Sequence, residues 1–122
     1  MDAFQDFELI SSYSRQQAIE DGVLVDVTVQ ARETGILLPT VLTDHLHHDL
    51  EEIPAESLGQ DYRGRLHDVL WMTFLKLKSF GGKKLTEVGF PAEEKVIIDG
   101  TTHTLWIAID GDGLTIMYPE DY

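Results

Sequence analysis

The chain has 122 residues, of which 43% are hydrophobic, and this is enough for one domain with its own core. It contains no cysteine, which excludes a disulfide framework, a thiolate zinc site, an iron–sulfur cluster and a cysteine nucleophile. The formal net charge of −13 opposes direct binding to nucleic acid or to an anionic membrane. We therefore expect a single domain over residues 1–122 that binds neither.

The beginning of the chain is acidic and lacks the basic and apolar regions of a secretory signal peptide. No apolar run approaches the ~20 residues that a membrane-spanning helix needs. We expect a cytoplasmic protein.

The first 42 residues carry signals for two short helices and two extended segments. A capping box that begins at Ser14 precedes the first helix. Thr28 is placed to cap the second helix, which Gly35 closes. Residues 23–27 are rich in valine and indicate a short buried strand, and residues 36–42 are predicted to be extended.

Two further helices follow. Thr43 is placed to cap a helix that continues to about residue 53. Asp61 is placed to cap the longest helix, about 62–80. Its middle, residues 69–75, is apolar on most sides, so we expect it to be the central buried helix.

Beyond residue 84 the spacing of apolar residues changes from a helical period to alternation, which is typical of strands. The four predicted strands cover residues 85–90, 95–99, 102–110 and 114–118. The sequence therefore predicts an α+β fold, with N-terminal helices packed on a C-terminal antiparallel sheet of three to four strands. His103 falls on an apolar strand face, where we expect it to be hydrogen-bonded.

Acidic residues are concentrated in the third helix and the loop that follows it. They are Asp44, Asp49, Glu51, Glu52, Glu56 and Asp61. Carboxylates gathered on one face attract a basic partner, so we interpret this cluster as a partner-binding site. Solubility alone is the other interpretation of the same charge.

The same helix carries a pattern typical of metal ligands. His45, His48, Asp49 and Glu52 fall at i, i+3, i+4 and i+7, which directs their side chains to one side of the helix. The chain has no His-Glu-x-x-His motif, phosphate-binding glycine loop or nucleophile elbow. We expect a protein that is not an enzyme and has no cofactor; the alternative is a small metal-dependent enzyme that uses His45, His48 and Asp49.

Three stretches of the chain resemble a known family. The first stretch comprises residues 13–28, continued by 31–35, Pro39 and Leu42-Thr43; the second is residues 63–72 and the third is residues 114–121. Together they are similar to an uncharacterised domain-of-unknown-function family of small proteins carried on bacterial plasmids, phages and integrated elements. That family has no established activity, so the resemblance implies a context only: an accessory protein of a bacterial mobile element.

Charge and resemblance together favour a protein that acts by binding another protein with a basic surface. In its specific form this function is counter-defence of the anti-CRISPR kind. An acidic protein would then occupy the nucleic-acid channel of a host defence complex and present carboxylates where phosphates lie. Other partner-binding roles in plasmid or phage physiology stay open.

Overall fold

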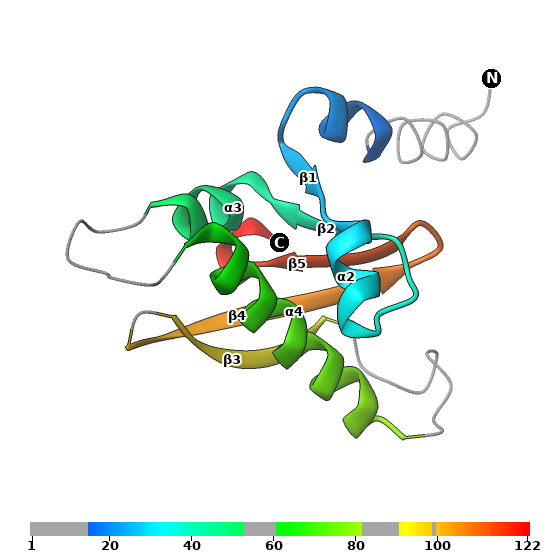
Figure 1. The fold of residues 1–122 in the computed structure, drawn as a ribbon. Coiled ribbons are helices and arrows are strands. Elements are labelled where there is room, and N and C mark those ends of the chain that lie inside the picture. The colour runs from blue at the N-terminus through cyan, green and yellow to red at the C-terminus, as the bar shows by residue number, and fades with distance from the viewer. Residues whose placement is uncertain (1–14, 53–60, 82–90, 99) are drawn as a thin grey trace.

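The computed structural model describes residues 15–52, 61–81, 91–98 and 100–122. Residues 15–20 are helical, and the labelled elements follow in chain order. They are β1 (Leu24–Asp26), α2 (Thr28–Thr34), β2 (Thr40–Thr43), α3 (Asp44–Glu51), α4 (Tyr62–Ser79), β3 (Ala92–Ile98), β4 (Thr101–Asp110), β5 (Gly113–Met117) and the 3-10 helix η2 (Pro119–Asp121) (Figure 1).

The described strands form one five-stranded sheet in the order β1-β2-β5-β4-β3. β2 and β5 pair in parallel, and the other neighbouring strands pair antiparallel. The α+β class is confirmed, and β3, β4 and β5 are the expected C-terminal antiparallel strands. The predicted strand over residues 85–90 lies outside the described residues.

The sheet differs from the prediction because two N-terminal segments join it. Val41 and Leu42 of β2 point to opposite faces of the sheet, yet both are buried. A strand that is apolar on both faces is typical of a sheet interior, and β2 lies there between β1 and β5. The result is a mixed sheet of five strands.

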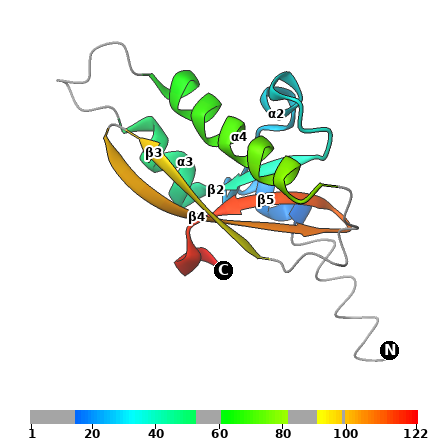
Figure 2. The same cartoon turned by 90° about the horizontal axis from the view of Figure 1, so that it is seen from below.

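Helices α2 and α4 cover the same face of the sheet, as Figure 2 shows. The core lies between this helical layer and the strands. Leu66, Val69 and Leu70 of α4 are almost fully buried. They belong to one cluster with Leu105 and Ile107 of β4, so one face of α4 packs on the core as expected. The prediction of a helix buried on most sides is wrong, because Trp71 and Leu75 in its middle are 44% and 41% exposed.

The predicted starts of α3 and α4 are confirmed by their capping hydrogen bonds. The Thr43 hydroxyl accepts from the Leu46 amide, and the Asp61 carboxylate accepts from the Gly64 amide at 2.8 Å. The start of α2 differs, because its N-cap residue is Val27. The Thr28 hydroxyl instead donates to the Asp26 carboxylate at 2.6 Å, so it ties the first turn of the helix to β1.

Gly113 permits the close approach of β5 to the segment before β2. Its φ is 132°, and a Cβ at this position would collide with the Pro39 carbonyl oxygen. The next residue, Leu114, donates its amide to that same oxygen at 2.8 Å. Because β2 and β5 run in the same direction, α3 and η2, which follow them, emerge at the same end of the sheet.

Candidate functional site

A hydrogen-bond network lies where α3 and η2 meet. Tyr118, between β5 and η2, donates its hydroxyl to Asp49 Oδ2 at 2.6 Å. His103 Nδ1 of β4 lies 3.3 Å from the same hydroxyl oxygen. Since the single hydroxyl proton goes to Asp49, the oxygen is free to accept from an Nδ1–H of His103. The expectation that His103 is hydrogen-bonded is confirmed.

A second set of contacts ties η2 to the start of α3. Asp121 accepts from the Thr43 hydroxyl at 2.9 Å, and its other oxygen lies 3.1 Å from His45 Nδ1. The ring of His45 lies 4.5 Å from that of Tyr118, measured between centroids. The C-terminal residues are therefore fixed to α3 by side chains from both elements.

The surroundings of the network raise the pKa values of two of its groups, Tyr118 and His45. Burial, and then the hydrogen bond to Asp49, raise the pKa of Tyr118 well above its ordinary value, so the phenol stays neutral. The hydrogen bond to Asp121 raises the pKa of His45 above 6.5. A neutral phenol that already donates to a carboxylate serves as a fixed donor and holds Asp49 in place.

The network borders an open pocket of about 360 Å³. Its lining residues are Asp49, Leu50, Glu52, Arg65, Ile98, Thr101, His103 and Tyr118. Arg65 is only 2% exposed, and its guanidinium donates to the backbone carbonyl oxygens of Glu52 at 2.6 Å and Leu50 at 3.5 Å. It thus satisfies the carbonyl end of α3 and fixes this helix on α4.

The predicted acidic cluster is divided by the fold into groups with different roles. Asp44, Glu51 and Glu52 are exposed on α3. Asp49 is held by Tyr118, and Asp61 is the N-cap of α4. Glu56 lies outside the described residues. The structure adds Glu120 and Asp121 of η2 beside α3, which extends the acidic surface beyond the predicted segment.

The four residues of the metal pattern form two separate pairs along α3. His45 Nε2 lies 4.0 Å from Asp49, and His48 Nε2 lies 3.5 Å from Glu52. His45 and Asp49 also face η2 and Tyr118 with their shorter hydrogen bonds. Among the described residues, no group of three or more His, Asp or Glu side chains is arranged to hold a metal ion.

Sequence reasoning missed Tyr118, Asp121 and Thr43 as parts of one network. Tyr118 and Asp49 are 69 positions apart, and Asp121 and Thr43 are 78 apart. No local signal in the sequence could have found them, because their contact depends on the pairing of β2 with β5, which determines which chain ends meet.

A buried carboxyl group in a second region was also missed. Glu94 of β3 is 6% exposed and accepts from the Thr73 hydroxyl of α4 at 2.7 Å. Within the described part of the chain, its Oε2 has no hydrogen-bond partner. Burial raises the pKa of Glu94 from 4.5 to about 7, against the opposing effects of Thr73 and Lys76.

In comparisons with known proteins, no family model, no curated protein and no solved structure matches this chain. None of the described helices is long and apolar enough to cross a membrane. The resemblance to a mobile-element family therefore stays a prediction.

Proposed function

We propose that this protein acts by binding a partner protein with a basic surface through an acidic face formed by α3 and η2. The acidic face consists of Asp44, Asp49, Glu51, Glu52, Glu120 and Asp121. The observation that carries the proposal is the parallel pairing of β2 with β5, which joins carboxylates from two distant chain segments into one surface.

Preorganisation supports this function. Asp49 and Asp121 are held by Tyr118, Thr43 and His45, so these carboxylates have little side-chain freedom left to lose when a partner binds. Exposed carboxylates beside them, such as Glu52, supply long-range attraction that speeds the encounter with a basic partner.

In its specific form, the proposal is counter-defence by nucleic-acid mimicry. The protein would be a cytoplasmic accessory protein of a bacterial mobile element, and its acidic face would occupy the nucleic-acid channel of a host defence complex such as a CRISPR effector. The net charge of −13 and the sequence resemblance support this form. Among the described residues, no geometric observation favours the alternative, a metal-dependent enzyme at His45, His48 and Asp49.

The test compares two variants that lose the same charge. The first replaces four exposed carboxylates of the acidic face by amides, at Asp44, Glu51, Glu52 and Glu120. The control replaces four exposed carboxylates elsewhere, at Glu20, Asp21, Asp68 and Asp112. Neither set touches the hydrogen bonds of Tyr118 or Asp121.

Tagged wild-type protein and both variants are used to capture partners from the native host, and the captured complexes are challenged with duplex DNA. The proposal expects a partner that the control variant retains and the acidic-face variant loses. Mimicry further expects that DNA displaces the protein from that partner. Equal capture by the two variants would overturn binding through the acidic face, and a complex that DNA leaves intact would overturn mimicry alone.

A further inference from the structure

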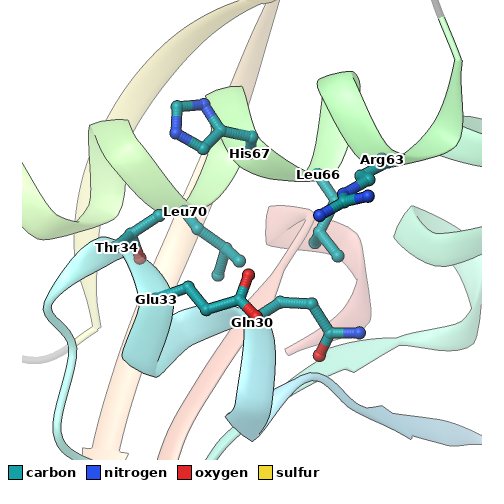
Figure 3. Close-up of a pocket in the computed structure, with 7 residues that line it drawn as sticks. All are labelled: Gln30, Glu33, Thr34, Arg63, Leu66, His67 and Leu70. Carbon is teal, nitrogen blue, oxygen red and sulfur yellow. The ribbon is translucent and has the colours of Figure 1, made fainter.

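A second pocket lies between α2 and α4 and shares no lining residue with the pocket at Tyr118. It has a volume of about 130 Å³ and is lined by Gln30, Glu33 and Thr34 of α2 and by Arg63, Leu66, His67 and Leu70 of α4. Figure 3 shows Leu66 and Leu70 pointing from α4 toward α2. These two leucines are 2% and 1% exposed, so the floor of the pocket is the apolar core itself.

Polar side chains of the described residues surround this apolar floor but form no hydrogen bond or ion pair with one another. Within the part of the chain that the structure describes, the side chains of Gln30, Glu33, Arg63 and His67 make no hydrogen bond or ion pair. The other four histidines each have a carboxylate or hydroxyl oxygen within 3.5 Å of a ring nitrogen. His67 is thus set apart from the other histidines, and it lies on the rim of this pocket.

The two charged groups come from opposite walls. The Glu33 carboxylate reaches from α2 into the space between the helices, and Arg63 projects from α4 (Figure 3). They do not pair with each other, although a ligand with both charges could pair with each of them. A guanidinium binds a carboxylate in a two-pronged geometry, and a carboxylate accepts well from an ammonium group.

The size of the pocket limits what it can hold. A water molecule takes about 30 Å³ of liquid, so 130 Å³ corresponds to roughly four waters. That space suits a short aliphatic group lying on Leu66 and Leu70, with its polar ends at the rim. A nucleotide or a lipid chain does not fit this volume.

We propose that the pocket between α2 and α4 binds a small aliphatic α-amino acid. Its carboxylate pairs with Arg63, its ammonium group pairs with Glu33, and its side chain packs on Leu66 and Leu70. This site is a ligand site of its own and goes beyond the binding of a partner through the acidic face.

The test follows the amide resonances of the full chain in NMR titrations with valine and leucine, up to about 10 mM, since ligands of so few atoms bind weakly. Two analogues each lack one charge: leucinamide has no carboxylate, and 4-methylpentanoate has no ammonium group. We expect leucine or valine to shift residues on both α2 and α4 in a saturable way, and each analogue to bind at least tenfold more weakly.

Two substitutions and two matched controls complete the test. Arg63→Gln and Glu33→Gln should each weaken binding at least tenfold, whereas Arg32→Gln and Asp68→Asn, which change exposed charges on the same two helices, should leave it unchanged. No saturable shift at the pocket with either amino acid would overturn the proposal. Equal binding of leucine and its single-charge analogues, or equal effects of the pocket variants and their controls, would overturn it as well.

Discussion

On the acidic face, the Asp49 carboxylate accepts from Tyr118, and the Asp121 carboxylate contacts Thr43 of β2 and His45 of α3. Between α4 and β3, by contrast, the carboxyl group of Glu94 has one hydrogen bond and one oxygen without a described partner. The first region is open to water, and the second is buried. The carboxyl groups of this protein are therefore not equivalent. Asp49 and Asp121 are held by side-chain hydrogen bonds on the acidic face, while Glu94 destabilises the fold when it ionises.

Glu94→Gln should have the largest effect on the free energy of unfolding. The folded-state pKa of about 7 lies above the ordinary value of 4.5, so the folded protein holds the Glu94 proton more tightly than the unfolded chain does. Stability of the wild type should therefore fall as pH rises from 4.5 through 7, by roughly 3 kcal/mol in total. The variant cannot ionise, so it should gain stability relative to the wild type over that window.

Chemical denaturation at about pH 4 and about pH 8 measures this effect. Glu93→Gln, on the exposed face of the same strand, is the control and should show no such pH-dependent gain. A constant difference between wild type and Glu94→Gln at the two pH values would show that Glu94 titrates normally, and that the two regions do not differ in this respect.

Tyr118→Phe should have the next largest effect, because it removes the fixed donor to Asp49 while keeping the ring. We expect a loss of about 1–2 kcal/mol in the free energy of unfolding, since water can partly replace the hydroxyl at the half-exposed Asp49. Tyr122→Phe changes a tyrosine that is 72% exposed and should cost less than about 0.5 kcal/mol. Equal losses in the two variants would contradict a structural role for the network.

Asp121→Asn should have the smallest effect, which is a lowered pKa of His45. NMR titration of His45 measures it. In the wild type, the His45 midpoint should lie above 6.5, because Asp121 accepts a hydrogen bond from the ring. The midpoint should fall in Asp121→Asn and stay in place in Asp44→Asn, which removes an exposed carboxylate that makes no hydrogen bond to His45. Since the folded pKa is raised, the stability that this pair adds is present below pH 6.5 and is lost as pH rises through the His45 midpoint.

Apart from the start of α2, where the expected cap Thr28 is not the N-cap residue, several helix ends could be predicted from local signals. The caps Thr43 and Asp61 and the left-handed Gly35 each determine a helix end through contacts within a few residues. The alternation in β3 also indicates which face is buried, with two exceptions: Glu94 stands at a core position, and Ile97 is 67% exposed on the other face.

The candidate site could not be predicted in the same way. Its acidic residues on α3 were visible in the sequence, but the contribution of η2 depends on β2 pairing with β5 in parallel. That pairing involves a close approach of Gly113 to Pro39, which no local pattern in either segment indicates. Long-range strand pairing is therefore the step at which sequence reasoning stopped.

Binding of a basic partner through the acidic face is tested most directly by the salt dependence of the dissociation constant for the captured partner. It is measured for the wild type, the acidic-face variant and the charge-matched control. We expect the slope of log Kd against log salt to be steep for the wild type and the control and shallow for the acidic-face variant. The same slope for both variants would contradict binding through the acidic face, because the effect would then depend on the net charge and not on the position of the carboxylates.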